Sequence, residues 1–280
     1  MLKPVMNDLL ISIDGLDSNS KIMLIKSFLE IVKNYPELIP VRFTISFLHD
    51  KDSFIRETST KILGYIGNKV PIESTDALIN FSLKDDEWIV RDAAVLSLGR
   101  LINEFKDNEE IIGKLVMLLD DKNSWVKRSV MNLLSSISGL DPDLIPFKFV
   151  EKNLKSEDPK IREGLANLLK IFGFTRIDMI FDSILLLLGD ESKDVRNNMI
   201  NSMVSIIQEK GLADMLSKLL QNLSDEGSIT SQQSIAIILG RTARYEEEKI
   251  KKRIISLLKI RCEASQDPII CETLNKLKED

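Results

Sequence analysis

Residues 83–101 read LKDDEWIVRDAAVLSLGRL, and residues 119–137 read LDDKNSWVKRSVMNLLSSI. In both stretches a leucine closes an apolar segment, a short acidic turn follows, and a valine next to a basic residue opens a second apolar segment. In the first stretch, Ala94, Leu98 and Leu101 follow the basic residue at a spacing of three to four positions. This spacing places them on one face of an α-helix, so each stretch predicts a turn followed by an amphipathic helix.

The same pattern recurs at a nearly constant period along the chain. Its basic residue stands at positions 56, 91, 127, 162 and 196, so successive copies are 34 to 36 residues apart. Weaker copies lie at residues 17–21, 223–235 and 267–271. Units of this length stack on their neighbours because they cannot bury an apolar face alone, so the period predicts tandem helical hairpins.

The residues before each second helix have the chemistry of helix starts. Asp158-Pro159 and Asp267-Pro268 place a side-chain acceptor at the N-cap and a proline at the first helical position, where no amide hydrogen is needed. The same N-cap position is expected for Asp17, Asp52, Glu87 and Asn123. The first helices of the hairpins are expected at residues 40–48, 74–83, 109–119, 144–154, 177–188, 213–223 and 246–262.

The whole chain therefore predicts an all-α fold of about seven and a half two-helix repeats. We expect a single domain over residues 1–280, with strong repeats over about 40–210 and degenerate capping repeats over about 1–39 and 211–280. In several second helices, a small residue directly follows the middle one of the three buried residues. We expect these small residues to let the backbone of a neighbouring helix approach. These residues are Gly64, Gly99, Ser135 and Gly240.

Composition limits the classes of function. The chain is 44% hydrophobic and 29% charged with a net charge of −5, so it has no general attraction for the phosphates of nucleic acids. Cys262 and Cys271 are too few for a disulfide framework and are wrongly spaced for a C-x-x-C pair, which favours a reducing compartment. Residues 1–17 lack the apolar core of a signal peptide. We therefore expect a soluble cytoplasmic protein.

The Asp-x-x-Ile/Val-Arg motif on a period of about 35 residues resembles the HEAT-repeat family, including its phycobilin-lyase variants. The resemblance covers nearly the whole chain and implies a right-handed α-α superhelix whose second helices line the concave side. It also implies that the acidic and basic residues of the motif support contacts between successive hairpins. The motif residues concerned are Asp52, Arg56, Arg91, Lys127, Asp158, Arg162 and Arg196.

A row of asparagines lies five positions after the motif's basic residue in three successive copies. Helical geometry points this position away from the buried face, and an amide side chain both donates and accepts hydrogen bonds. Asn132, Asn167 and Asn201 therefore predict a groove that holds an extended peptide, although a solvated helix face gives the same pattern. Around the row we expect Arg128, Glu163, Asn197 and Lys170.

Two other features allow a functional and a structural interpretation. Trp88 and Asp92, with Lys127 and Arg128 one copy later, resemble the residue set of HEAT-like alkylpurine DNA glycosylases, but the repeat itself also puts such residues there. Residues 241–261 are rich in Arg and Lys, which fits either an anionic docking patch or an exposed helix with charge pairs. His49 is the only histidine and is expected to be a polar turn residue.

The sequence shows no nucleotide-binding, hydrolase or metal-ligand motif. We therefore expect a non-catalytic protein-protein interaction scaffold without a metal or cofactor, which binds an extended or helical segment of a partner protein. The alternatives are a HEAT-like lyase subunit that acts on a chromophore-bearing protein and a DNA-binding or glycosylase protein. The sequence leaves the partner's identity and the oligomeric state open.

Overall fold

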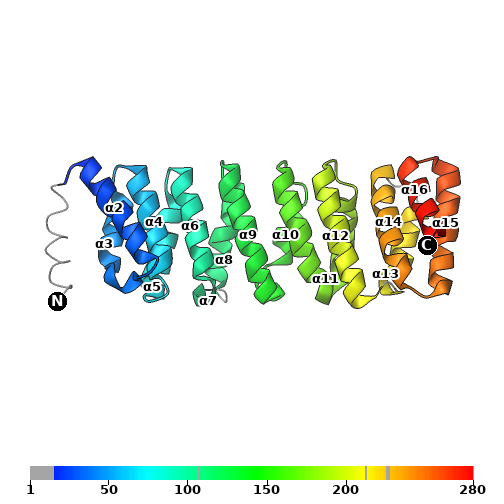
Figure 1. Ribbon diagram of the computed structural model, residues 1–280, viewed down its shortest axis with the longest axis horizontal. Helices are drawn as coiled ribbons and strands as arrows, with labels where there is room; N and C mark the ends of the chain where they lie inside the picture. The colour runs from blue at the N-terminus through cyan, green and yellow to red at the C-terminus, as the bar shows by residue number, and fades with distance from the viewer. Residues whose placement is uncertain (1–15, 106–107, 212, 225–227, 280) are drawn as a thin grey trace. The chain divides into compact units, whose positions relative to one another are not determined.

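The computed structural model describes residues 16–105, 108–211, 213–224 and 228–279. Every element within these ranges is an α-helix or a 3-10 helix, which confirms the all-α class (Figure 1). The chain divides into two compact units, residues 1–145 and 146–280, which are described separately below. A single continuous domain stays a prediction. The segment considered for a signal peptide lies almost wholly outside the described residues, as does part of the copy at 223–235.

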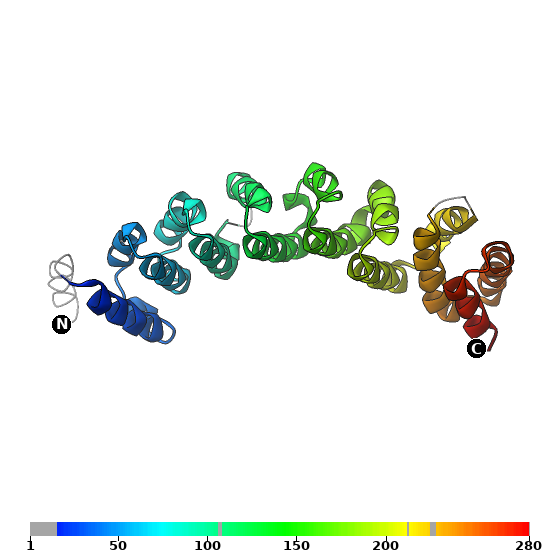
Figure 2. The same cartoon turned by 90° about the horizontal axis from the view of Figure 1, so that it is seen from above.

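The first unit contains eight described α-helices, joined mostly by short 3-10 turns. Those that begin at a motif copy, α2, α4, α6 and α9, contact one another in chain order. Figure 2 shows the helices of this unit in two layers. The elements are α2 (Ser18–Val32), η2 (Pro36–Leu38), α3 (Val41–Ser46), η3 (Phe47–His49), α4 (Ser53–Ile66), α5 (Pro71–Asn80), η4 (Ser82–Lys84), α6 (Trp88–Arg100), α7 (Ile102–Phe105), α8 (Glu109–Met117), η5 (Leu118–Asp120), α9 (Ser124–Leu140) and η6 (Pro142–Leu144).

The second unit repeats this alternation. Its longest element, α11, contains a non-helical backbone at Arg176 (φ −140°, ψ 40°), so the predicted first helix at 177–188 follows its predecessor without a loop. The motif-bearing helices α12, α14 and α16 contact one another in order. The elements are α10 (Phe147–Asn153), α11 (Pro159–Leu188), α12 (Lys193–Lys210), α13 (Ala213–Ser224), α14 (Ile229–Thr242), η7 (Ala243–Tyr245), α15 (Glu248–Ser265) and α16 (Pro268–Glu279).

The core lies where the helical spacing predicts it. In α6, Ala94, Leu98 and Leu101 are at most 1% exposed. The same three positions are buried in the other strong copies, and burial of such side chains contributes about 1.5–3 kcal/mol each. These residues are Ser59, Leu63 and Ile66, then Val130, Leu134 and Ile137, then Leu165, Leu169 and Phe172, and Met199, Met203 and Ile206.

Small residues bring neighbouring helices together at two of the predicted positions. A β-carbon on Gly64 would lie 2.7 Å from the Ser97 β-carbon, and one on Gly240 would lie 2.5 Å from Cγ2 of Thr273. At Gly99 the nearest atom would be 3.8 Å away, which is an ordinary contact. The predicted approach of a neighbouring backbone is therefore confirmed at Gly64, where the Ser97 α-carbon would lie 2.9 Å away, whereas at Gly240 the close atom belongs to a side chain and at Gly99 the prediction is wrong.

All but one of the predicted N-cap residues bond to the start of their own helix. Asp52 accepts a hydrogen bond from the Phe54 amide, and Asp158 accepts one from the Lys160 amide. Glu87 stands at the N-cap of α6 but makes no side-chain cap bond. The carboxylates of Asp52 and Asp158 therefore cap α4 and α11, and their implied role between hairpins stays a prediction. The other confirmed caps are Asp17, Asn123 and Asp267.

The motif arginines instead bind the aspartate two positions before the next N-cap. Arg56 donates to Asp85 through Nε (2.7 Å) and Nη2 (2.9 Å), and Arg91 binds Asp121 with the same distances. Arg162 binds Asp190 in this way within the second unit, at 2.6 and 3.0 Å. These side chains are at most 16% exposed. Each bidentate pair therefore joins two successive motif turns within a compact unit.

The remaining arginine donors and carboxylate lone pairs are also used. Nη1 of Arg91 donates to the Asp85 carbonyl (2.7 Å), in the turn that precedes its own helix. The Asp121 carboxylate accepts a further bond from the Asn123 amide (2.8 Å). A buried ion pair is stabilising only when such additional bonds satisfy both partners, and here they do. We call this arrangement the Arg–Asp link.

Not every basic motif residue forms this link. Arg196 Nη1 donates to the carbonyls of Asp190 and Glu191, while the turn that follows its helix contains residues outside the described ranges. In the weaker first copy, Lys21 forms a single ion pair with Asp50 at 3.1 Å. Lys127 favours ionisation of Asp121 and so contributes to its electrostatic environment.

Two cysteines, expected to be without structural pairing, form a disulfide. Cys262 lies in the last turn of α15 and Cys271 in the first turn of α16, and their α-carbons are 5.0 Å apart. The turn between the two helices is short enough to bring the sulfur atoms together. Cysteine usage therefore gives no support for a reducing compartment, and a cytoplasmic location stays a prediction.

Removing one partner of an Arg–Asp link is expected to destabilise the first unit. In an Arg91→Ala variant the Asp121 carboxylate stays buried without its countercharge, which should lower the free energy of unfolding by about 3–5 kcal/mol. Urea unfolding followed by circular dichroism measures the change. Arg42→Ala, which removes an exposed cation from α3, is the control, and equal midpoints for the two variants would contradict the role of the link.

Acid should weaken the same link. Burial opposes ionisation of Asp121, but the bonds from Arg91 and the Asn123 amide outweigh it and lower the pKa below 3.8. A lowered folded-state pKa stabilises the protein above the unfolded-state pKa of about 3.9, and this stabilisation is lost as the pH falls through the folded value. The urea midpoints of the native chain and of Asp121→Asn are measured between pH 7 and pH 3. Below about pH 4 the midpoint of the variant should fall less steeply than that of the native chain. A variant curve parallel to the native one would count against this explanation.

Reduction of the disulfide should loosen the terminal hairpin alone. The closed loop is short, so its loss should cost about 2–3 kcal/mol of local stability. Hydrogen exchange of the α16 amides is expected to accelerate after treatment with dithiothreitol, while that of the α6 amides stays constant. The double variant Cys262→Ser, Cys271→Ser should exchange fast with or without the reductant, and a reductant effect in that variant would contradict the assignment.

Candidate partner-binding surface

In the first unit, one exposed face of α9 combines an aromatic, a cationic and an amide side chain. Trp125, Arg128 and Asn132 follow one another at helical spacing, and Trp125 is 58% exposed. The Arg128 guanidinium lies over the Trp125 ring, 5.1 Å from its centroid. Arg128 Nε is buried and has no hydrogen-bond partner. The predicted residues Arg128 and Asn132 therefore share a face, and Trp125 belongs to it as well.

This face continues onto α6 and α4. Ser129 Oγ of α9 donates to Asp92 Oδ1 of α6 (2.6 Å), which fixes the two helices side by side. Leu96, one turn after Asp92, is 51% exposed. The Arg100 guanidinium lies over the Tyr65 ring of α4, 4.5 Å from its centroid. We call the face formed by Tyr65, Asp92, Leu96, Arg100, Trp125, Arg128 and Asn132 the Trp125 surface.

The residue set that resembles DNA glycosylases is only partly brought together. Trp88 is 39% exposed in the first turn of α6, and Asp92 faces α9 through its bond to Ser129. Arg128 stacks on Trp125, while Lys127 acts on Asp121 in the motif turn. Asp92 and Arg128 therefore lie on the Trp125 surface, whereas Lys127 serves the turn.

In the second unit, the predicted amide residues lie on α11 and α12. Asn167 and Asn201 are exposed, and Asn197 is exposed one turn before Asn201. The Asn201 Oδ1 atom accepts a hydrogen bond from Arg241 Nη1 of α14 (2.9 Å). Asn132 belongs to the first unit, so the predicted row of asparagines is divided between the two units and each part is described separately. The Arg241 contact joins residues 40 positions apart and was not predicted from the sequence.

The other predicted members of this groove are less available. Glu163 accepts a hydrogen bond from Lys160 Nζ (2.5 Å), and Lys170 is half-buried. Of the predicted residues in the second unit, Asn167 and Asn197 are therefore the two that combine an exposed side chain with the absence of a described side-chain hydrogen bond.

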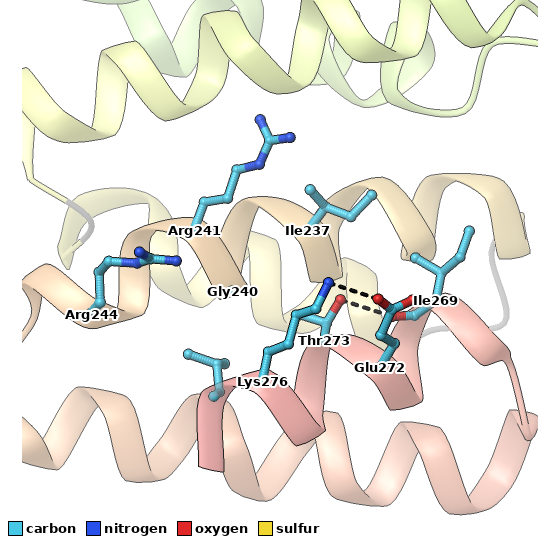
Figure 3. A pocket seen from close by; sticks show the side chains of 9 residues that line it. Ile237, Gly240, Arg241, Arg244, Ile269, Glu272, Thr273 and Lys276 are labelled. Carbon is cyan, nitrogen blue, oxygen red and sulfur yellow. Dashed lines mark hydrogen bonds and ion pairs between the residues drawn. The ribbon is translucent and has the colours of Figure 1, made fainter. Parts of the chain in front are cut away.

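A second feature of this unit is a cleft between α14 and α16, about 400 Å³ in volume (Figure 3). Its walls contain three cationic side chains, one carboxylate and several apolar side chains. The lining residues are Ile237, Gly240, Arg241, Arg244, Ile269, Glu272, Thr273, Lys276 and Leu277.

His49 has a packing role in the first unit. Its ring lies edge-on to Phe81, with 4.8 Å between the centroids. Within the described ranges, no three His, Cys, Asp or Glu side chains come together as ligands for a metal ion. Nor does any helix in those ranges combine the length and apolar character that crossing a bilayer requires.

Comparisons with known proteins identify a fold. No family model matches the chain. No curated protein is similar to it. Among solved structures, the X-ray structure of Escherichia coli YibA matches with a TM-score of 0.53 at 20% identity, covering 98% of this chain and 97% of that chain. The similarity shows a shared helical fold over nearly the full length of both proteins.

Proposed function

We propose that this chain is a non-catalytic scaffold that binds a segment of a partner protein on the exposed faces of its motif-bearing helices. The proposal includes a HEAT-like right-handed α-α superhelix, in which these helices line the concave side. The 34 to 36 residue period, the Arg–Asp links and the helical fold shared with YibA support this architecture.

The Trp125 surface carries the functional part of the proposal. Tryptophan, tyrosine and arginine are the residues most enriched among those that dominate binding energy in protein interfaces. Here Trp125, Arg128, Arg100 and Tyr65 lie on three adjacent helices, with the exposed Leu96 between them. Stacked rings and guanidinium groups lose little conformational freedom on binding, so such a surface is suited to holding a protein segment.

The asparagines extend the surface with hydrogen-bonding capacity. Asn132 is exposed beside Trp125 and Arg128, and Asn167 and Asn197 are exposed in the second unit. An exposed amide can pair with both the N–H and the C=O of an extended backbone. In this proposal the aromatic and basic side chains supply most of the affinity, and the amides orient the bound backbone.

The net charge of −5 disfavours the DNA-binding alternative, because the binding of nucleic acid depends on a basic face. The lyase alternative requires a bound chromophore or a second subunit to supply its chemistry. The two alternatives give distinct results in the experiment below. The lyase alternative predicts a copurified tetrapyrrole, and the DNA-binding alternative predicts retention of DNA that depends on the salt concentration.

Replacing Trp125 by Ala should remove partner binding and leave folding intact. Loss of a residue that dominates an interface costs about 2 kcal/mol or more, which corresponds to roughly a 30-fold weaker complex. Proteins that copurify with the tagged chain are quantified by mass spectrometry for the native chain, Trp125→Ala and Tyr35→Ala. Tyr35 is the control because it is an equally exposed aromatic residue, at 57%, outside the Trp125 surface.

The proposal requires a defined protein that Tyr35→Ala retains and Trp125→Ala loses, with equal melting temperatures for the two variants. It fails if no protein shows this difference. It also fails if a chromophore or DNA is the ligand whose retention depends on Trp125.

A further inference from the structure

The cleft between α14 and α16 has an excess of positive charge. Arg241 of α14, Arg244 of η7 and Lys276 of α16 line it (Figure 3). Glu272 is its only acidic lining residue, and Lys276 Nζ neutralises that carboxylate at 2.7 Å. The local charge is therefore opposite in sign to the net charge of the chain, which is −5.

The two arginines are not satisfied by carboxylates. Arg241 donates to the neutral amide oxygen of Asn201, and Arg244 is exposed. Among the described residues, no carboxylate forms an ion pair with either guanidinium. This differs from the motif arginines Arg56, Arg91 and Arg162, whose guanidinium groups are each bonded to an aspartate.

The same cleft contains apolar surface beside the cations. Ile269 is 38% exposed and Ile237 is half-buried, and both line the cleft. Gly240 lets α16 approach closely, because a β-carbon there would lie 2.5 Å from Thr273 Cγ2. A volume of about 400 Å³ accommodates one or two side chains of a ligand.

We propose that the α14–α16 cleft binds an acidic segment of a partner protein, with a carboxylate between Arg241 and Arg244 and an adjacent aliphatic side chain on Ile237 and Ile269. Guanidinium groups form two parallel bonds with a carboxylate, which gives the cleft its specificity. This inference rests on the proposed scaffold function and adds the chemistry of a bound segment. It concerns the second compact unit and does not use the Trp125 surface.

The cleft fits a peptide better than it fits a nucleic acid. None of the residues that line the cleft is aromatic, so it offers no ring for base stacking. The exposed Ile269 and the half-buried Ile237 give an aliphatic side chain an apolar surface to contact, and a phosphate gains nothing from such a surface. The observations therefore favour an acidic protein segment.

A phage-displayed library of random 12-residue peptides, selected on the full-length chain, tests the inference. The expected result is enrichment of Asp or Glu next to Leu, Ile, Val or Met. Selected peptides are then synthesised with a fluorescent label, and their binding is measured by fluorescence anisotropy. Arg241→Ser, Arg244→Ser should weaken binding about tenfold or more, because charge-assisted bonds to both guanidinium groups are lost.

The matched control is Lys252→Ser, Arg253→Ser. It removes the same charge from exposed positions of α15 that do not line the cleft, so it should leave the affinity unchanged within about twofold. Equal losses in the two double variants would overturn the inference, because they would indicate a general charge effect. Circular dichroism melting curves of both variants check that the helices remain folded.

The failure of this inference and the failure of the scaffold function give different results. Peptides without acidic enrichment whose binding depends on Trp125 would overturn the cleft assignment and leave the scaffold function standing. No selected peptides at all would overturn both. Stronger retention of polyuridine RNA or of phosphatidylserine vesicles than of peptides, dependent on Arg241 and Arg244, would also overturn the assignment to an acidic protein segment.

Discussion

The Arg–Asp link is the interaction on which the stacking within each compact unit depends. A guanidinium group has five N–H donors in a rigid plane, and Arg91 uses them on two different turns. Nε and Nη2 bind Asp121 in the following turn, and Nη1 binds the Asp85 carbonyl in its own. A lysine has a single charged group on a flexible stem and cannot bind both turns in this way. The link therefore fixes both the distance and the register between neighbouring hairpins.

The exceptions to the link follow the organisation of the chain. The third strong copy has Lys127 in place of the motif arginine. The fourth strong copy has Ser156 at the position where the other motif turns have the acceptor aspartate. The division between the compact units, at residues 145 and 146, falls between these two positions. The arginine and aspartate that form the Arg–Asp links of Arg56, Arg91 and Arg162 are therefore both replaced on either side of this division.

The copy at residues 223–235 has a glutamine in place of the motif arginine, and hydrogen bonds and a nearby disulfide join its helix to the following hairpin. Gln232 stands in the place of the motif arginine, is fully buried and accepts a hydrogen bond from Arg261 Nε at 2.7 Å. The neighbouring Gln233 donates to the Asp267 carboxylate. The disulfide between Cys262 and Cys271 then joins α15 to α16. These contacts join α14, α15 and α16 to one another.

The sequence alone predicted the features that depend on local spacing. Helix positions, N-caps and the three buried positions of each second helix follow from residues within one turn or two of each other. The acceptor of Arg91 was not predicted, because each motif turn contains several acidic residues and only packing decides which one faces the preceding helix. The Asn201–Arg241 bond and the cysteine pairing were missed for the same reason, since both depend on how separate helices meet.

The division between repeated and variable positions bears on function. Buried positions hold mostly apolar residues in each copy. The position five after the motif's basic residue, which is exposed or half-buried, is occupied in turn by Lys61, Leu96, Asn132, Asn167, Asn201 and Ile237. Similar cores keep the helices in one geometry, so the exposed positions are free to differ without loss of stability. The resulting faces are aromatic and basic in the first unit and rich in amides and then cations in the second. In the proposed scaffold function, a partner would therefore be recognised by different local sites, each with its own specificity.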